Sequence, residues 1–539
     1  MTSSLFPGLP PSSRKGFRAA LILLLVAVIG FAVLRWQAPM IATAALGLPV
    51  LLLLYLRQIG IRRFIGARNV ALSVILGVGL GACWAPVAGG IVARAYAAAL
   101  GAETELVEVL LYGVAVPISE ALAMIVPAAV VWMVDRSRRR VLDGFAIGAL
   151  GATALTAAAT VSLLVPQLAM GVTAPDRSVG SLVIEALVEG VAWPLVGVAA
   201  GGIAGIALWF TRSVKTSRHR RWVVPAAVLI VLILVGSMGV VDIIPLPSVW
   251  YGALHLLNAV LAVFVLRLVI AAALLHETHE STGDSGQLEC PECHHTVVPL
   301  AFCTDCGVVI SAMPQRATSY AGVLGPLAAG LAVAVAVGVV VSIRITPVPE
   351  IFVCPPDCGR PPLGTPVESN PRFSGDNGAF SVAYPDEGSA YEVTFDPPGV
   401  NGVELKYIGG DTGTLTLFGE HGDGRTAKQI AQQLIESRYP GAVVDYEIPN
   451  ASVGYQPGFG VVADVFPTGS TTTYTRLRVI VMAAVKHDYA LIAAAVGPYH
   501  QFSPDYGNGH PSGANVELAM DMGKYVNSFK WYGDRYGRP

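Results

Sequence analysis

The sequence has few charged residues. Only 13% of its 539 residues are Asp, Glu, Lys or Arg, whereas 53% are hydrophobic. Soluble globular proteins carry about 25% charged residues, so this composition excludes an ordinary soluble protein and predicts an integral membrane protein. The formal net charge of −2 gives no indication of nucleic-acid binding. Nothing resembles a cleaved signal peptide, because the first apolar run leads at once into a second.

Long apolar runs occur in nine places, and each is long enough to cross a bilayer. A helix needs about 20 apolar residues to cross the hydrocarbon core. The predicted spans are 17–34, 38–56, 70–93, 105–133, 141–168, 181–210, 222–243, 249–275 and 319–342. The sequence therefore predicts a polytopic α-helical membrane protein with about nine transmembrane helices and the lipid bilayer as its first partner.

Arginine and lysine gather in every second connection between these runs. The clusters lie at Arg14–Arg18, Arg57–Arg68, Arg136–Arg140 and Arg212–Arg221. The intervening connections carry at most a lone arginine, such as Arg177. Because loops rich in Lys and Arg stay in the cytoplasm, we expect a plasma-membrane protein with its amino terminus inside and its carboxyl-terminal region outside.

Changes in composition divide the chain into six segments. They are a cytoplasmic tail (1–16), an eight-helix membrane domain (17–275), a linker with a cysteine module (276–318, module 287–310), a ninth transmembrane helix (319–342), a Pro/Gly-rich linker (343–377) and an extracytoplasmic α/β domain (378–539). Within the membrane domain, small residues recur at four-residue spacing at Gly144/Gly148 and Gly197/Gly201/Gly205. Such spacing predicts close helix packing rather than a ligand site.

Two Cys-x-x-Cys motifs lie in the predicted cytoplasmic module. The segment CPECHHTVVPLAFCTDCG places nine residues between the pair Cys290/Cys293 and the pair Cys303/Cys306. Two such turns direct four thiolates at one point, so the spacing predicts a structural Zn site in a zinc ribbon, with a β-hairpin between the motifs. A redox-active pair of dithiols is the alternative. The module contains no Arg or Lys, so we expect no nucleic-acid partner.

A second pair of cysteines follows the ninth apolar run. In IFVCPPDCGRPP, Cys354 and Cys358 are close enough for a small disulfide loop, and an oxidising exterior favours that bond. Free thiols or incidental metal binding are the alternatives.

Several ionisable residues interrupt the apolar runs. Glu120 lies within the fourth run, and Glu185 and Glu189 lie one helical turn apart in the sixth. His255 lies in the eighth, and Asp143 opens the fifth. Because a charge inside the bilayer costs several kcal/mol, each is a candidate functional residue. The alternative is structural: Glu120 is protonated or hydrogen-bonded between helices, the outer Glu pair reaches the interface, and Asp143 pairs with Arg139 or Arg140.

The run from Pro117 to Asn258 resembles the PrsW-type intramembrane metalloproteases, which are related to the wider CAAX-protease group. Glu120 matches the first motif, although Ser119 or Ala121 stands where a second Glu belongs. Asp143-Gly144 matches the start of the next helix, with Ala159-Thr160 in place of its Glu-Asn pair. Trp193 lies where the first His is expected, and His255 with Asn258 matches the final pattern at tighter spacing.

The resemblance implies a metal site, with Glu120 and His255 retained and Glu185 and Glu189 as substitutes for missing ligands. A hydrolytic site needs about three ligands and a base. We therefore expect a scaffold or sensor with a protease-like core that lacks activity. It would link the zinc ribbon to the external domain and bind an unidentified membrane or envelope protein. The alternatives are an active intramembrane metalloprotease with a second metal, and a transporter.

The carboxyl-terminal segment alternates apolar and polar residues as strands do. We predict strands at 378–385, 391–397, 403–409, 413–420, 442–447, 473–485 and 488–497, and helices at 426–441 and 513–529. This order resembles the PsbP/Mog1-type α/β sandwich of some bacterial envelope lipoproteins. No nucleophile–base pair or phosphate loop is evident, and we expect His421, His487, His500 and His510 to be surface residues.

Overall fold

The computed structural model describes most of the chain. The described residues are 11–58, 65–96, 110–135, 140–175, 177–213, 220–244, 246–276, 288–290, 293, 295–297, 320–346, 351–352, 367–386, 389–408, 413–448, 450–466, 476–499, 503–504 and 516–531.

Nine helical segments of the described chain are long and apolar enough to cross a membrane. They are α1 (Pro11–Val33), α2 (Gln37–Gln58), α3 (Ala67–Tyr96), α5 (Val116–Val134) with η3 (Leu111–Ala115) before it, α6 (Val141–Leu163), α8 (Val179–Leu187) continuing through η4 (Val188–Ala192) into α9 (Trp193–Ser213), α10 (Arg220–Ile243), α11 (Ser248–His276) and α12 (Tyr320–Ile345). The nine predicted spans are confirmed as helices, and the protein is a multi-pass membrane protein.

Two helical segments depart from simple α-helices. η3 and η4 are short π-helical turns, and each adds a residue to the turn that leads into α5 or α9. Such turns change the direction of the side chains that follow them and often occur at functional sites. The predicted fifth span also divides, because α6 ends at Leu163 and the short helix α7 (Val165–Ala169) begins with a proline in its first turn.

Glycine allows three of the helices to touch through their backbones. A Cβ atom on Gly148 of α6 would lie 2.0 Å from the carbonyl oxygen of Gly201 of α9, and one on Gly205 would lie 2.0 Å from that of Gly144. On the other side of α6, a Cβ on Gly77 of α3 would lie 2.2 Å from a carbonyl oxygen. No side chain fits at these distances, so the predicted role of the small residues in helix packing is confirmed.

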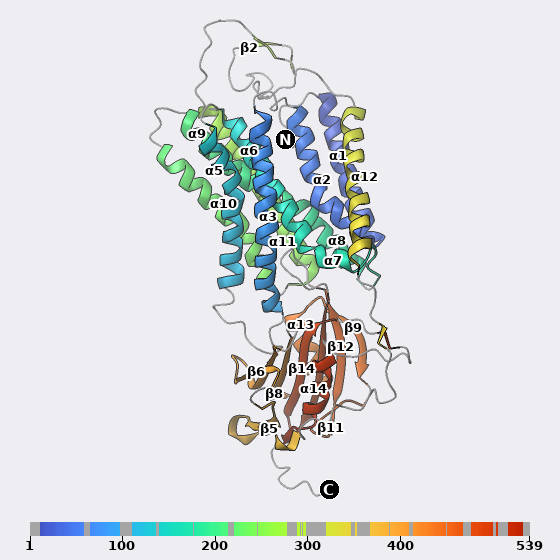
Figure 1. The fold of residues 1–539 in the computed structure, drawn as a ribbon. Coiled ribbons are helices and arrows are strands. Elements are labelled where there is room, and N and C mark those ends of the chain that lie inside the picture. The colour runs from blue at the N-terminus through green and yellow to red at the C-terminus, as the bar shows by residue number, and fades with distance from the viewer. Residues whose placement is uncertain are drawn as a thin grey trace.

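Helix α12 joins the two ends of the helical domain. It packs against α1, α2 and α7, and the hydroxyl of Ser342 near its end donates a hydrogen bond to the carbonyl of Leu168 (2.8 Å). A hairpin of β1 (Leu288–Glu289) and β2 (Thr296–Val297) lies at the end of the bundle where the chain begins, and the carboxyl-terminal domain lies at the opposite end (Figure 1). We call these the hairpin end and the sheet end.

The carboxyl-terminal domain is a seven-stranded antiparallel sheet with helices on both faces. Its strand order is β6-β7-β8-β14-β13-β12-β9. The strands are β6 (Tyr391–Phe395), β7 (Asn401–Tyr407), β8 (Gly413–His421), β9 (Val443–Ile448), β12 (Phe459–Val465), β13 (Leu477–Lys486) and β14 (Tyr489–Pro498). Helix α13 (Ala427–Arg438) packs on β12 and β13, and α14 (Val516–Val526) packs on β14 and β8. The α/β class of this domain is therefore confirmed.

Local sequence explains the central hairpin and the first helix of this domain. Between β13 and β14, His487 and Asp488 both have positive φ (52° and 59°), as a tight two-residue hairpin turn requires. Helix α13 begins with a reciprocal capping box between Thr426 and Gln429. The helix ends at Arg438, three residues before the predicted end.

Ordered structure also occurs within the range predicted as a linker. Short elements there are β3 (Ile351–Phe352), η6 (Val367–Ser369), β4 (Arg372–Ser374) and η7 (Asp376–Gly378). Strand β4 pairs with β5 (Phe380–Ala383), which pairs with β16 (Lys530–Trp531). Two further small pairs are β10 (Ser452–Val453) with β11 (Gln456–Pro457), and β15 (Ser503–Pro504) with β3. Cys354 and Cys358 lie outside the described residues, so their disulfide stays a prediction.

Candidate functional site

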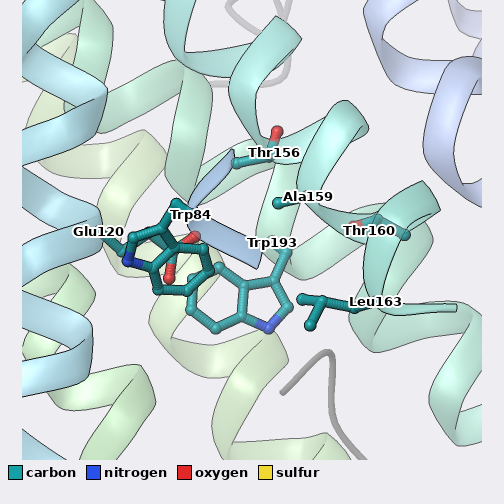
Figure 2. A pocket seen from close by; sticks show the side chains of 7 residues that line it. All are labelled: Trp84, Glu120, Thr156, Ala159, Thr160, Leu163 and Trp193. Atoms are coloured by element: carbon teal, nitrogen blue, oxygen red, sulfur yellow. The ribbon is translucent and has the colours of Figure 1, made fainter. Parts of the chain in front are cut away.

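Glu120 lines a small cavity between four helices. Its carboxylate is buried on α5, next to Ser119, whose hydroxyl accepts a hydrogen bond from the indole N–H of Trp84 (2.8 Å). The cavity is lined by Trp84, Glu120, Thr156, Ala159, Thr160, Leu163 and Trp193, which come from α3, α5, α6 and α9 (Figure 2). It leaves about 10 Å³ for the centre of a water-sized molecule, which is room for about one such molecule.

Glu189 lies in the π-helical turn η4, and its side chain contacts Thr160, which also lines the cavity. The Thr160 hydroxyl donates a hydrogen bond to its Oε2 atom (3.2 Å), while the Oε1 atom has no hydrogen-bond partner among the described residues. Glu189 is 2% exposed and interacts electrostatically with Glu185, Asp242 and Glu120. Glu189 therefore lies within electrostatic range of both other predicted carboxylates, Glu120 and Glu185.

Glu185 is neutralised by Arg177, which precedes α8. The two side chains form an ion pair and are 2% and 4% exposed. The pair is a charge contact, because the Nη2 and Oε2 atoms that meet are not aligned as a hydrogen bond. Gln167 of α7 donates to Oε1 of Glu185 (2.9 Å), and Gln37 of α2 donates to Gln167 (2.9 Å). This Arg177–Glu185–Gln167–Gln37 cluster ties α2, α7 and α8 together.

Both ring nitrogens of His255 lie close to an acceptor oxygen, although Nε2 and the Asp242 oxygen nearest it are not aligned as a hydrogen bond. Its Nε2 atom lies 3.2 Å from Oδ1 of Asp242 on α10, and its Nδ1 atom lies 3.0 Å from the carbonyl oxygen of Tyr251. The ring is 0% exposed and packs on the Tyr251 ring at 4.3 Å. Asn258, one turn further along α11, donates to the carbonyl of Leu234 on α10 (2.9 Å). The histidine and the asparagine thus both tie α11 to α10.

The predicted core residues meet at the sheet end of the bundle. Leu168 of α7 is bonded to Ser342 beside that end, and Thr160 lies near the same end of α6. Asp143 lies at the other end of α6, buried in its first turn. Among the described residues, no group of three His, Cys, Asp or Glu side chains has an arrangement that holds a metal ion.

The cysteine module is described only in part. Cys290 and Cys293 lie between the two strands of the β1–β2 hairpin, and the amide of Cys290 donates to the carbonyl of His295 (2.8 Å). The hairpin therefore encloses the first Cys-x-x-Cys motif, and the hairpin expected between the two motifs falls mostly on residues outside those described. Cys303 and Cys306 lie outside the described residues, so the four-cysteine zinc site stays a prediction.

The sheet domain meets the membrane core at Arg177. The Arg177 guanidinium lies 5.6 Å from the centroid of the Phe466 ring, and Arg476 lies 5.8 Å from the same ring. Arg476 and the buried Arg478 both bind Asp464. Burial alone would raise the pKa of Asp464, but hydrogen bonds from Arg478 and Arg476 outweigh it and hold the pKa below its ordinary value. Asp464 and the two arginines near Phe466 therefore hold one another in place.

Sequence reasoning missed the partners that organise this site. Asp242 stands alone near the end of an apolar run, and Gln167 and Gln37 are uncharged. Arg177 is the only basic residue between its two apolar runs, and this isolated position could have indicated a functional role from the sequence.

In the sheet domain, His421 and His487 are exposed, which confirms them as surface residues, whereas His500 and His510 lie outside the described residues.

No protein-family model, curated protein or solved structure matches this chain, so its assignment depends on the residues themselves.

Proposed function

We propose that this multi-pass membrane protein is a scaffold or sensor that couples its sheet domain to the membrane core and to a cytoplasmic zinc ribbon. The observation that carries the proposal is the position of Arg177. Its guanidinium pairs with the buried Glu185 and also lies over the ring of Phe466 in the sheet domain. A guanidinium over an aromatic ring stabilises the contact by about 0.5–2 kcal/mol. A ligand that moves Phe466 would therefore act directly on a buried charge pair.

A continuous set of contacts leads from Arg177 to the helix that runs to the hairpin end. Gln167 bonds Glu185, and the neighbouring Leu168 accepts the hydrogen bond of Ser342 in α12. Helix α12 begins at Tyr320, shortly after the cysteine module in the sequence. A physical route of this kind supports coupling between the two ends, provided that the contacts have two alternative arrangements.

The zinc ribbon is the proposed cytoplasmic end of this route. The thiol of Cys290 is buried, and the backbone reversal from Cys290 to His295 fits a turn that presents two thiolates to a metal. Cys303 and Cys306 would supply the other two ligands. Four thiolates close the coordination sphere of Zn, so the ion would stabilise the fold of the module and leave no open position for catalysis.

A scaffold fits the membrane core better than a protease does. Both ring nitrogens of His255 already face a partner, and Trp193 occupies the position where the resemblance to PrsW-type proteases expects a histidine. The indole of Trp193 cannot replace an imidazole as a metal ligand, because its only polar atom is an N–H donor.

Substitution of Phe466 tests the coupling. In full-length protein in lipid nanodiscs, we expect Phe466→Leu to increase amide hydrogen exchange at α7, at the start of α2, in α12 and in the β1–β2 hairpin. Tyr455→Leu is the matched control, because Tyr455 is 81% exposed in the β10–β11 turn of the same domain. If exchange changes only at α7 and α2, the contact between Arg177 and Phe466 is supported but the proposed coupling to the hairpin end is rejected. A change confined to the sheet domain would reject both.

An active metalloprotease is the second candidate, favoured by the convergence of Glu120, Glu189 and the His255–Asp242 pair. Measured metal content separates the two functions. A scaffold should hold about one Zn per chain whether or not His255 is changed to Ala. A protease should hold a second metal that both His255→Ala and Glu120→Gln remove, together with cleavage of a membrane peptide that the same two changes abolish.

A further inference from the structure

The carboxyl group of Glu120 has no positively charged partner among the described residues. Glu120 is 6% exposed and accepts no hydrogen bond from the described residues. The charged groups that act on it, Asp242 and Glu189, are acidic as well. The described cation of this region, Arg177, is already paired with Glu185. A carboxylate that is withdrawn from water and faces only other carboxylates is stabilised either by taking up a proton or by a cation beside it.

The cavity wall beside Glu120 is suited to a positive charge. Figure 2 shows the Glu120 carboxylate beside the rings of Trp84 and Trp193, with the indole nitrogen of Trp193 turned away from it. The N–H of Trp84 is directed to Ser119, so both indoles offer ring surface to the cavity. The Thr160 hydroxyl donates its proton to Glu189, which leaves its oxygen lone pairs as acceptors. Carboxylate oxygen, hydroxyl oxygen and the faces of two indoles all attract cations.

The size and composition of the cavity limit which cation fits. It has room for about one water-sized group. A divalent transition metal would need more ligands of the His, Cys or carboxylate type than the described residues bring together there. We propose that Glu120, Trp84 and Trp193 bind a small monovalent cation, either an alkali-metal ion or a primary ammonium group, in the cavity between α3, α5, α6 and α9. This site depends on the membrane core alone, so it stands or falls separately from the proposed function.

Tryptophan fluorescence tests the site. Full-length protein in detergent is titrated with NaCl, KCl or methylammonium chloride, with N-methylglucamine chloride keeping the ionic strength constant. We expect a saturable change in emission, an affinity about tenfold weaker in Glu120→Gln, and a smaller amplitude in Trp193→Phe. Glu436→Gln, on the exposed face of α13, should behave as the parent protein. Tetramethylammonium, which is too large for the cavity, should give no saturable signal.

Two outcomes would overturn the proposal: no saturable response to any of the three small cations, or the same response in Glu120→Gln as in the parent. If Glu120→Gln fails to fold, two other variants test the site. A cation site at Glu120 predicts a changed emission amplitude in Trp193→Phe and partial binding in Glu120→Asp.

The source of the cation is determined in nanodiscs without alkali ions. Emission that shifts with phosphatidylethanolamine but not with phosphatidylglycerol identifies a lipid ammonium group, and emission that responds only to added salt identifies a free ion.

Discussion

The Arg177–Glu185 pair offers a test of how the membrane core and the sheet domain are joined. Both side chains are almost completely buried, so removing one charge leaves the other in a medium of low dielectric constant. In Arg177→Met, Glu185 would keep only the hydrogen bond from Gln167 (2.9 Å). Losing one partner of a buried pair costs about 3–5 kcal/mol. At about 2 °C per kcal/mol for a domain of this size, the melting temperature should fall by about 6–10 °C.

The double variant Arg177→Met/Glu185→Gln distinguishes this reasoning from a simple loss of packing. It removes both charges, keeps the length of the Glu185 side chain and replaces the arginine with a shorter apolar side chain, so that neither position carries a buried ion. Replacing a whole buried pair is often neutral or stabilising, so we expect the double variant to melt within about 2 °C of the parent protein. Differential scanning fluorimetry in one detergent compares four proteins: the parent, Arg177→Met, Glu185→Gln and the double variant. A double variant that is no more stable than Arg177→Met would refute the electrostatic explanation.

An exposed pair provides the control for this cycle. Lys428 and Glu447 lie 2.8 Å apart with side chains 51% and 57% exposed. Solvent screens such a pair, which contributes about 0–1 kcal/mol. We therefore expect Lys428→Met to change the melting temperature much less than Arg177→Met does. Equal losses from both substitutions would mean that burial of the Arg177–Glu185 pair is not the decisive quantity.

Three further predictions follow from particular contacts. Gly148→Ala should push α6 away from Gly201 of α9 and destabilise the bundle by about 1–3 kcal/mol, whereas Gly30→Ala, with nothing within 4 Å, should not lower the melting temperature. Burial alone would raise the pKa of Asp464, but the bonds from Arg478 and Arg476 hold it below its ordinary value. The ionised Asp464 therefore stabilises the sheet domain fully above a pH of about 4, and this stabilisation is lost as the pH falls through the lowered pKa. Asp464→Asn should weaken that acid dependence in hydrogen exchange of β12 and β13. Cys290→Ser should lower Zn, measured by mass spectrometry, from about one ion per chain to nearly none, and retained Zn would contradict the four-thiolate site.

The membrane helices were predictable because their signal is local and strong. Length and hydrophobicity alone decide whether a segment spans a bilayer, and the predicted boundaries differ from the helices by only a few residues in most spans. The interruptions were harder to predict. The π-helical turn that holds Glu189 depends on packing against neighbouring helices. No residue type within the turn indicates from the sequence that it contains an extra residue.

In the sheet domain, pattern reasoning found the hairpins and missed β12. Its sequence, FGVVADV, is buried at six of seven positions, so it does not show the apolar–polar alternation of a half-exposed strand. The one charged residue in it, Asp464, reads as polar in the sequence but is buried against Arg478 in the structure. The pairing of two charges across neighbouring strands is long-range information, which a pattern within one segment does not contain.

Most of the buried ionisable residues described in the membrane domain lie at the sheet end, which supports the proposed coupling to the sheet domain, whereas Asp143 lies at the hairpin end. Arg177 lies over Phe466 and pairs with Glu185, and Glu189 extends the same electrostatic cluster to Glu120 and Asp242. The part of the bundle nearer the hairpin end is different, because α6 and α9 meet there through glycine backbones that leave little freedom to move. This tight packing, together with the charged cluster at the sheet end, favours the proposed response to events at the sheet end over passage of a solute through the bundle. A transporter needs a site reachable from both sides, and the polar cluster here is placed beneath a single domain.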